Sequence, residues 1–400
     1  MENLAIKGGS AVRTKPFPAW TISTPVDEQG LIDTYSSNAW GAKGEKNRIF
    51  RQTFAEYAGV KHCLTVANGT VSIELILRAL GIGRGDEVIV PPYTFIASIS
   101  ALIYAGVTPV FADIDKETFL LSPESAEKAI TPRTKAIMPV YVGGRPADLD
   151  AFEALCKKYN LYLIGDAAQG VGSEFNGKGI GNYGIATSIS CQHSKNLSSG
   201  EGGLILTNDD GFHARLLQIL DGGRDEQGQY SYVGLDNGMS EFQASILSTQ
   251  LKALPDQITK RMENAAYLDE QLAKLEFAYP LKADPRITRN SYHLYLFGLR
   301  EECFKGISRN TFLSAVEAEG IETLSGGYAP LYNFPCMTGP YTERCIGGRI
   351  HTTPDTPITE LVSKHEGCWL YHSVLLGERE DMDDIIRALV KVYTHLDELA

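Results

Sequence analysis

One lysine lies in a setting that could make it reactive. The segment 188–203 holds Lys195 among small and polar residues, directly before a β-rich run. A lysine in a confined, partly desolvated place has a lowered pKa and attacks carbonyl groups, forming a Schiff base. Most of the 37 basic residues simply solvate the surface, so Lys195 is singled out only by its neighbours.

An acidic residue ends an apolar run nearer the N-terminus. Leu161–Gly165 is followed by Asp166 and, after two alanines, by Gln169. A carboxylate at the end of a buried strand is costly unless a cation or a hydrogen-bond donor faces it. Two interpretations fit equally well: a cap on a following helix, or the partner of a ligand.

A phosphate site and an aromatic face are also indicated. Asn68, Gly69 and Thr70 lead into a helical pattern, and free N–H groups with a hydroxyl at a helix N-terminus bind phosphate. Phe95 follows the β-rich run Glu87–Val90, where its ring could cover a planar ligand. Taken singly, a tight turn and core packing explain these features as well.

Together, these residues fit a planar aldehyde with a phosphate arm and a ring nitrogen. Pyridoxal phosphate requires an amine for its aldehyde, a carboxylate for its pyridinium nitrogen and donors for its phosphate. Lys195, Asp166 and the 68–70 turn supply these groups in a workable order. The sequence therefore predicts a pyridoxal phosphate site.

From about residue 60 to 207 the sequence alternates between β-rich runs and helical patterns. These are the elements that must position the residues described above. This alternation is typical of an α/β domain with parallel strands joined by crossover helices. Ligands of such a sheet bind beyond the carboxyl ends of its strands, where Asp166 and Ser190 fall. The expected strands are Glu87–Val90, Val107–Ala112, Ala136–Val140, Leu161–Gly165, Ala186–Ser190 and Gly203–Thr207.

A change of pattern near Pro255 indicates a second domain. Two long helical patterns are expected to be separated at this proline, and a smaller α+β pattern follows. We expect an N-terminal arm and a large domain over 1–254, and a small domain over 255–400. Residues 1–45, rich in Pro, Gly and Ser, are expected to wrap a neighbour or the small domain.

The composition is that of an acidic globular protein of 400 residues. Its formal net charge of −12 disfavours nucleic acid and anionic lipid as partners, and no apolar run reaches the ~20 residues of a membrane span. The first residues lack the features of a secretory signal, and the seven cysteines are scattered and never spaced as CxxC. We therefore expect a cytoplasmic protein without disulfides or metal.

The joint pattern resembles the DegT/DnrJ/EryC1/StrS family of sugar and cyclitol aminotransferases, which are pyridoxal phosphate enzymes of fold type I. The similarity extends over essentially the whole chain. It implies an aspartate aminotransferase-like fold, with a mixed, mainly parallel sheet in the large domain and a smaller C-terminal α+β domain. The matching stretches are Asn68–Thr70, Gly85–Pro91, Asp166–Gln169 and Ser190–Gly203.

The resemblance implies a role for each matched residue. Lys195 would form the internal aldimine and then move a proton between substrate and cofactor. Asp166 would pair with the pyridinium nitrogen, Gln169 would contact the ring hydroxyl, and Phe95 would stack on the ring. The phosphate would be bound by Gly69, Thr70 and Ser190.

The family also sends an asparagine from the partner subunit to that phosphate. The segment 235–241 covers this region but departs from the usual Asn-aromatic-Arg-Met-Ser-Glu pattern, and Asn237 is our candidate. A site shared in this way makes a two-fold homodimer the minimal working unit.

The implied reaction is a transamination in two halves. Glutamate or glutamine gives its amine to the cofactor, and a keto-sugar or keto-cyclitol takes it, as in the biosynthesis of antibiotics or surface glycans. Segments 289–293 and 369–377 are more similar to the inosose aminotransferases and 3-amino-5-hydroxybenzoate synthases than to the nucleotide-sugar branch. Residues that could contact substrates, or simply pack or solvate, are Trp40, Tyr332, His372 and Arg224.

Two alternatives stay open. A dehydratase or aromatising enzyme of the 3-amino-5-hydroxybenzoate synthase type would release water and need no stoichiometric amino donor. A non-catalytic sensor would bind pyridoxal phosphate and turn nothing over. Family dehydratases carry a histidine at the lysine position, and Lys195 is retained here with His193 two residues before it, so transamination is favoured.

Overall fold

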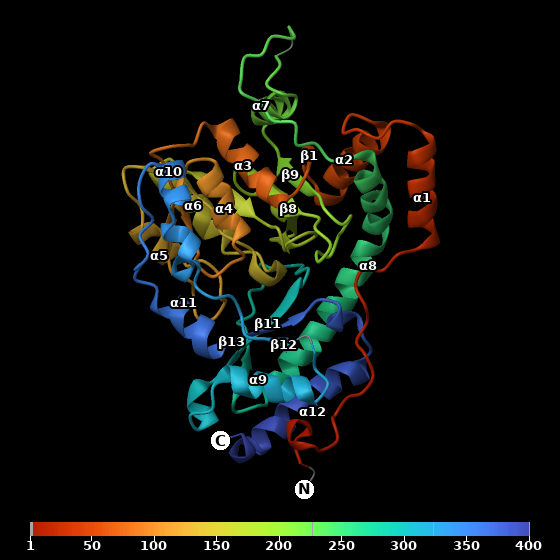
Figure 1. Ribbon diagram of the computed structural model, residues 1–400, viewed down its shortest axis with the longest axis vertical. Coiled ribbons are helices and arrows are strands. Elements are labelled where there is room, and N and C mark those ends of the chain that lie inside the picture. Colours follow the sequence, from red (N-terminus) through yellow and green to blue (C-terminus); the bar gives the residue numbers. More distant parts are fainter. Residues whose placement is uncertain (1–2, 226, 323, 400) are drawn as a thin grey trace.

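Two main β-sheets organise the computed structural model, which describes residues 3–225, 227–322 and 324–399 (Figure 1). The larger sheet has seven strands in the order β1-β9-β8-β5-β4-β2-β3. Strands β3, β2, β4, β5 and β8 are mutually parallel, whereas β9 runs antiparallel to both its neighbours. The expected mixed, mainly parallel sheet is therefore confirmed. Its strands are β1 (His62–Val66), β2 (Glu87–Val90), β3 (Thr108–Phe111), β4 (Thr134–Ile137), β5 (Tyr162–Asp166), β8 (Ala186–Ser190) and β9 (Gly203–Thr207).

Both faces of the large sheet are apolar and covered. Side chains alternate along a strand, so Val88 and Val90 join one buried cluster while Ile89 joins the other. Several of the crossover helices begin at side-chain caps; at the start of α6, Asp148 accepts from the Ala151 N–H. The helices around this sheet are α2 (Glu45–Ala58), α3 (Gly69–Leu80), α4 (Ala97–Tyr104), α5 (Pro123–Lys128), α6 (Leu149–Tyr159) and α7 (Asp210–Leu220).

The smaller sheet is antiparallel, in the order β10-β11-β13-β12, and has its own buried core. Its strands are β10 (Ala278–Pro280), β11 (Leu294–Leu299), β12 (Leu324–Ser325) and β13 (Gly367–Tyr371). The helices of this half are α9 (Arg309–Ala318), α10 (Pro340–Ile346), α11 (Pro357–Leu361) and α12 (Arg379–Thr394). A two-stranded ribbon pairs β6 (Glu174–Phe175) with β7 (Lys178–Gly179).

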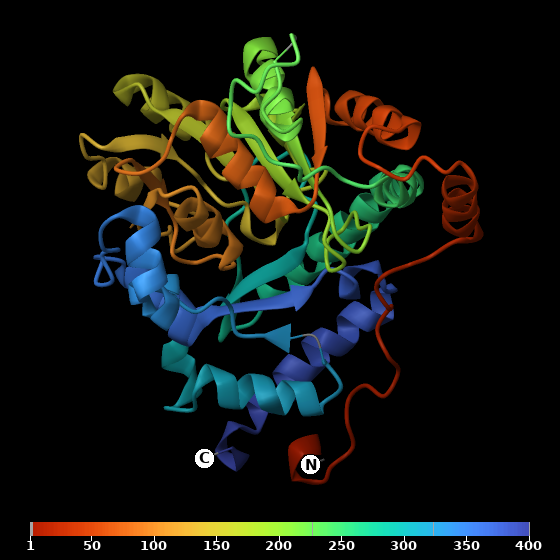
Figure 2. The same cartoon turned by 45° about the horizontal axis from the view of Figure 1, so that its top comes forward.

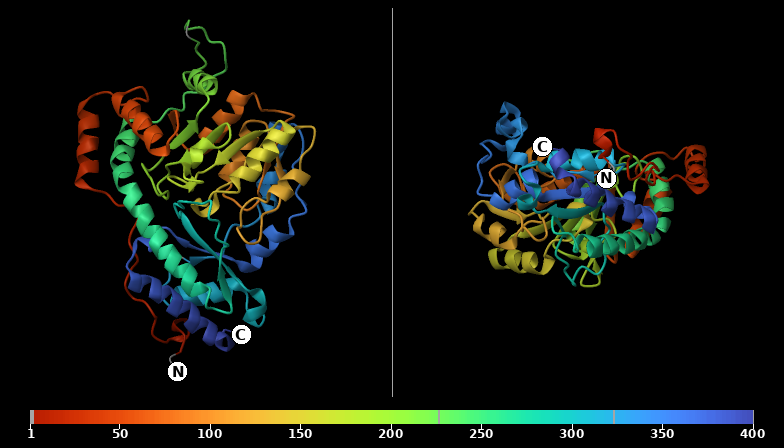
Figure 3. Two further views of the ribbon diagram at one scale, coloured as in Figure 1. Left: turned by 180° about the vertical axis from the view of Figure 1, so that it is seen from behind. Right: turned by 90° about the horizontal axis from the view of Figure 1, so that it is seen from below.

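One long helix, α8 (Glu241–Leu272), runs from the large sheet to the small one (Figures 1 and 3). It passes through Pro255 without ending, so the expected separation into two helices is wrong. Pro255 is exposed, while Leu251, Leu254 and Ile258 around it are buried, so packing outweighs the hydrogen bond that proline removes.

The N-terminal arm lies along the small half of the molecule, one of the two expected locations, before α1 (Pro25–Ser36) packs on α8 (Figure 2). Arg13 pairs with Asp381 at 2.8 Å, and the buried Glu319 accepts from the Ala5 N–H at 2.8 Å. Helix α1 was not expected from the sequence. No described helix has the length and apolar character that crossing a membrane demands.

Candidate active site

The structure brings Lys195 and Asp166 together at the carboxyl ends of adjacent strands. Asp166 is the last residue of β5, and Lys195 lies in the loop that follows β8. A turn fixes the lysine backbone, since its N–H donates to the Gln192 carbonyl at 2.8 Å. Burial lowers the pKa of the Lys195 amine to about 8, although the nearby Asp166 carboxylate raises it. The amine has no hydrogen-bond partner within the described ranges.

Asp166 is a buried carboxylate with both oxygens partly occupied. The Ser98 hydroxyl donates to Oδ2 at 2.6 Å, and the Ala168 N–H donates to Oδ1 at 3.1 Å. Burial raises the pKa of Asp166, while these two donors and the Lys195 charge lower it. The chain after Asp166 forms a turn, so the helix-cap alternative does not apply. Lone pairs remain for one further donor, such as a protonated ring nitrogen.

Gln169 is held from both ends of its amide. Its Oε1 accepts from the Gly143 N–H at 2.7 Å, and its Nε2 donates to the Tyr328 hydroxyl at 2.8 Å. Tyr328 in turn packs on Trp369, with ring centroids 4.7 Å apart. Ser98 and Tyr328 were both missed at the sequence level. Ser98, three residues after Phe95, could have been noticed, but nothing near Tyr328 in the chain marks it.

The N-terminus of α3 lies against the end of β8. The Asn68 side chain caps the helix by accepting from the Val71 N–H at 2.9 Å. The N–H groups of Gly69 and Thr70 have no acceptor in the part of the chain that the structure describes. A Cβ atom on Gly69 would lie only 2.9 Å from the Ser190 Cβ. Glycine is therefore required, and the predicted phosphate residues gather in one place.

The two aromatic residues of the loop after β2 differ in their surroundings. Tyr93 is fully buried in the core, whereas the Phe95 side chain is 56% exposed. An exposed aromatic ring beside polar groups is available for stacking on a ligand. The stacking role of Phe95 stays a prediction.

Asn237 lies next to the end of β1 in its own chain. Its carbonyl accepts from the Ala67 N–H at 2.8 Å, which holds segment 236–238 against the end of β1. Within the described residues its side chain has no hydrogen-bond partner. Arg224 is exposed and donates to the Tyr230 hydroxyl at 2.7 Å.

The residues suggested for the acceptor pocket differ in their surroundings. Tyr332 is buried in the core, and its hydroxyl is bonded to Thr356 at 2.9 Å and to Glu360, so it is removed from the pocket. Trp40 is half-exposed and stacks on Tyr35. His372 is fully buried, and its Nε2 lies 3.0 Å from the Ser194 carbonyl next to Lys195. His193 is an exposed loop residue.

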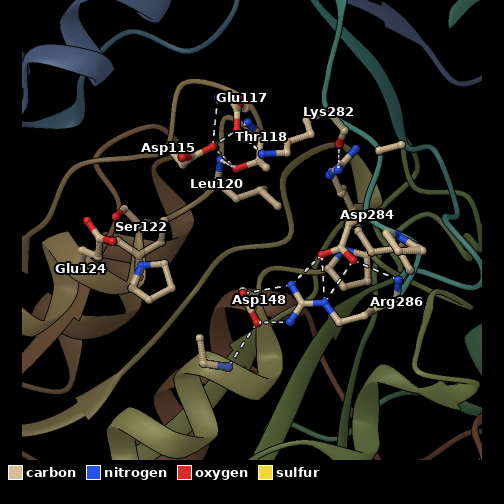
Figure 4. A pocket seen from close by; sticks show the side chains of 18 residues that line it. Asp115, Glu117, Thr118, Leu120, Ser122, Glu124, Asp148, Lys282, Asp284 and Arg286 are labelled. Atoms are coloured by element: carbon tan, nitrogen blue, oxygen red, sulfur yellow. Dashed lines mark hydrogen bonds and ion pairs between the residues drawn. The ribbon is translucent and has the colours of Figure 1, made fainter.

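A cavity of about 640 Å³ lies elsewhere, between the start of α6 and segment 282–287 (Figure 4). The guanidinium of Arg286, on this cavity, is already neutralised by Asp148 at 2.8 Å and Asp284 at 2.7 Å. None of the predicted site residues lines it. We therefore place no catalytic chemistry there.

The residues at the strand ends fit pyridoxal phosphate. Its aldehyde requires an amine without competing partners, its ring nitrogen requires a buried carboxylate, and its phosphate requires free N–H groups at a helix start. Lys195, Asp166 and the Gly69 turn provide these groups, and the Gly69 backbone approaches Ser190 too closely for any other residue.

Comparison with known proteins agrees with this chemistry. The sequence profile of the DegT/DnrJ/EryC1/StrS aminotransferase family matches residues 25–390. The chain belongs to this family. Like the family's solved structures, it is an aminotransferase of fold type I, and both the predicted family and the predicted enzyme class are confirmed. The family and fold imply pyridoxal phosphate as the cofactor.

Individual relatives cover the whole chain. The L-glutamine:2-deoxy-scyllo-inosose aminotransferase of Streptomyces lividus is 36% identical over 98% of each chain. A putative L-glutamine:3-amino-2,3-dideoxy-scyllo-inosose aminotransferase of Streptoalloteichus tenebrarius is 33% identical over 99% of each. The crystal structure of 3-amino-5-hydroxybenzoic acid synthase superposes with a TM-score of 0.85 at 29% identity, covering 96% of this chain and 100% of that one.

Proposed function

We propose that the protein is a pyridoxal phosphate-dependent aminotransferase that transfers the amine of L-glutamine to a keto-cyclitol of the scyllo-inosose type in aminocyclitol biosynthesis. The observation that carries this proposal is the full-length identity of 36% to a glutamine-dependent inosose aminotransferase. The buried Lys195–Asp166 pair supports it from the chemistry of the site.

The cofactor would be held by residues from four places in the large sheet. Gly69, Thr70 and Ser190 would donate to its phosphate, and Gln169 would donate its remaining amide N–H to the ring hydroxyl. Phe95 would cover one face of the ring. When bound, pyridoxal phosphate supplies an aldehyde for the amine and a ring that withdraws electrons from the bond being broken.

Lys195 would act first as the amine that binds the aldehyde and then as the proton carrier. With a pKa of about 8, an appreciable fraction of the amine is uncharged at neutral pH, as nucleophilic attack requires. Once released from the aldehyde, Nζ would be suited to take the proton from the α-carbon of glutamine and to give it to the cofactor carbon that had carried the aldehyde. A strongly basic, solvated lysine would stay protonated and perform neither task.

Asp166 would hold a proton on the ring nitrogen. Its burial makes a charged carboxylate costly, so a cation opposite it is strongly favoured over water. The hydrogen bonds from Ser98 and the Ala168 N–H fix the direction in which the carboxylate points.

We also propose that the enzyme is a cytoplasmic homodimer. Arm and α1 side chains that are exposed in one chain, including Val26 at 57% and Tyr35 at 66%, offer an apolar face for a second copy. Asn237 would reach the partner's phosphate site from such a contact. All seven cysteines are free, as in a reducing compartment. We retain the division into domains over 1–254 and 255–400, with α8 continuous across it.

The test is a direct assay with defined substrates. Purified protein loaded with pyridoxal phosphate is mixed with L-glutamine and 2-deoxy-scyllo-inosose, and the aminated cyclitol is measured by mass spectrometry. We expect product with this ketone and none with a nucleotide keto-sugar. Product only from the nucleotide keto-sugar would contradict the acceptor class. Loss of water from the acceptor without consumption of glutamine would instead indicate the aromatising type of reaction.

A further inference from the structure

The carbonyl next to Lys195 is held by two donors from the small half of the molecule. The Tyr371 hydroxyl and the His372 Nε2 both bond the Ser194 oxygen, the latter at 3.0 Å. The Ser194 carbonyl belongs to the peptide that enters Lys195. Residues at the end of the small sheet therefore hydrogen-bond directly to the peptide that precedes the reactive lysine.

The geometry fixes which nitrogen of His372 carries the proton. A carbonyl only accepts, so Nε2 must carry the hydrogen that points to Ser194. The guanidinium of Arg261 only donates, and its Nη2 lies 3.2 Å from the His372 Nδ1, which must therefore be bare. A second proton on His372 would face the N–H of Arg261. Burial and the charge of Arg261 accordingly lower the pKa of His372 well below its usual value.

Arg261 is an unusual buried cation. It lies in the middle of α8 with none of its surface exposed, and its acceptors in the described part of the chain are the carbonyl and Nδ1 of His372. Its Nη1 has no partner. No carboxylate among the described residues lies within 4 Å, and the Trp20 ring lies 5.7 Å from its central carbon. A buried charge without an anion is costly, so stability alone does not account for it.

The titratable groups that face His372 come from four elements. Arg261 approaches from α8, Tyr371 from the end of β13 and Lys195 from the loop after β8. His293, just before β11, stacks on the imidazole with ring centroids 5.5 Å apart. No carboxylate is among them, and only the Ser194 carbonyl favours a charged imidazole, which burial and the charge of Arg261 outweigh.

We propose that Arg261 and His372 form a positioning relay, in which the guanidinium holds the imidazole as the Nε2–H form and the imidazole holds the Ser194–Lys195 peptide so that the amine stays in its desolvated place. The inference rests on the proposed role of Lys195. Neither Arg261 nor His372 is proposed to touch substrate. Through α8 and β13, the small half of the molecule thereby determines the position of the Lys195 amine.

The first test reads Lys195 itself in cofactor-free protein. Competitive acetylation at a series of pH values, followed by peptide mass spectrometry, gives the midpoint at which Lys195 becomes reactive. Replacing His372→Leu removes the donor, and we expect the Lys195 midpoint to rise by roughly one unit or more, toward that of a solvated lysine. His372→Gln retains a donor for Ser194 and an acceptor for Arg261. Its Lys195 midpoint should lie at least halfway back from the His372→Leu value to the wild-type value.

A matched control is His193→Leu, which removes an exposed imidazole two residues from Lys195 without touching the Ser194 carbonyl. Its midpoint should equal that of the wild-type protein. An unchanged midpoint in His372→Leu, or an equal shift in His193→Leu, overturns the relay. Because the assay uses no cofactor or substrate, it is independent of the acceptor assay. Failure of the latter with a normal His372 effect would locate the error in the proposed function.

The second test reads the imidazole and does not depend on a variant that folds. The ¹⁵N shifts of histidine-labelled wild-type protein should show His372 as the neutral Nε2–H form down to about pH 5, far below the usual midpoint near 6.5. The Nδ1–H form, or a charged imidazole at pH 6, would contradict the relay. In Arg261→Met, the constraint on Nδ1 is removed and protonation should become detectable; Lys260→Met, on the adjacent α8 residue, should leave the spectrum unchanged.

Discussion

Two clusters of buried charge in this molecule are built in opposite ways. We call the first the arm anchor: Arg13 pairs with Asp381 and Asp384 at 2.8 and 2.9 Å, and Glu319 pairs with Lys391 at 2.8 Å. Its charges are all compensated. At the second, the strand ends of the large sheet, the Lys195 amine has no hydrogen-bond partner within the described residues, and Asp166 retains unused lone pairs.

The difference distinguishes charges that hold the fold from charges kept for chemistry. A paired, buried charge resists change in its protonation, whereas an unpaired, desolvated amine has a pKa near the working pH. Loss of a charge in the arm anchor should therefore lower stability and leave activity unchanged, whereas changes at the strand ends should lower activity without lowering stability.

The largest effect is expected at Lys195. Lys195→Ala removes both the amine that binds the aldehyde and the proton carrier, so we expect kcat to fall by about 10⁴-fold or more. The exposed Lys178→Ala should keep normal activity. The measurement is product formation from L-glutamine under single-turnover conditions. A Lys195→Ala enzyme whose rate lies within tenfold of the wild-type rate would show that the strand-end charges are not kept for chemistry.

The arm anchor should respond in stability alone. Arg13→Met leaves the buried Asp381 with only the exposed Lys15, at 3.5 Å, as a cationic partner. We expect a loss of about 3 kcal/mol in the free energy of unfolding, at the low end of the ~3–5 kcal/mol that breaking a buried pair from one side costs. Activity per folded molecule should be unchanged. Lys305→Met, which loses an exposed pair with Asp397, should cost less than about 1 kcal/mol. Urea unfolding of the three proteins checks this.

Asp166→Asn keeps the shape of the side chain but removes the charge opposite the ring nitrogen. We expect kcat to fall by roughly 10²-fold, by analogy with other groups that stabilise charge in the site, with little loss of folding stability, since burial already makes that charge costly. The exposed Asp256→Asn is the matched control. A large loss of stability with normal turnover would show that Asp166, like the arm anchor, holds the fold and does not serve the chemistry.

The smallest effect concerns stability and pH. The folded-state pKa of Lys195, about 8, lies below the ordinary 10.5. Between these two pH values the unfolded chain keeps a proton on this lysine that the folded chain has lost, so the stability of the cofactor-free protein rises with pH. Burial of the charged lysine therefore destabilises the protein most below pH 8. Lys195→Met should therefore be more stable than wild type at pH 7, by roughly 1–3 kcal/mol at about 1.4 kcal/mol per pKa unit. This advantage should diminish as the pH rises from 8 to 10.5. Chemical denaturation at several pH values measures it, and a variant less stable at pH 7 would contradict the desolvation of the amine.

Much of the fold could be predicted because local pattern and tertiary context agree. The bounds of β2, β8 and β9 are those expected from their short β-rich runs. Strand β1 was missed. The expected break at Pro255 is absent because buried side chains on both sides of the proline hold α8 together.

The site could be predicted only in part. Lys195, Asp166 and Gly69 are recognisable because each follows or precedes a strand or helix with an unusual residue type. Ser98 and Tyr328 act on Asp166 and Gln169 across 68 and 159 positions of the chain, so local spacing could not show which residue either one bonds. The bond between His372 and Ser194 spans 178 positions and likewise depends on the docking of the small half.

The most direct test of the central claim identifies the amine that binds the cofactor. The protein is incubated with pyridoxal phosphate, reduced with borohydride and digested, and the peptides are analysed by mass spectrometry. We predict that the reduced cofactor is attached to Lys195 and to no other lysine. Attachment at another lysine, with the peptide of Lys195 unmodified, would contradict the account.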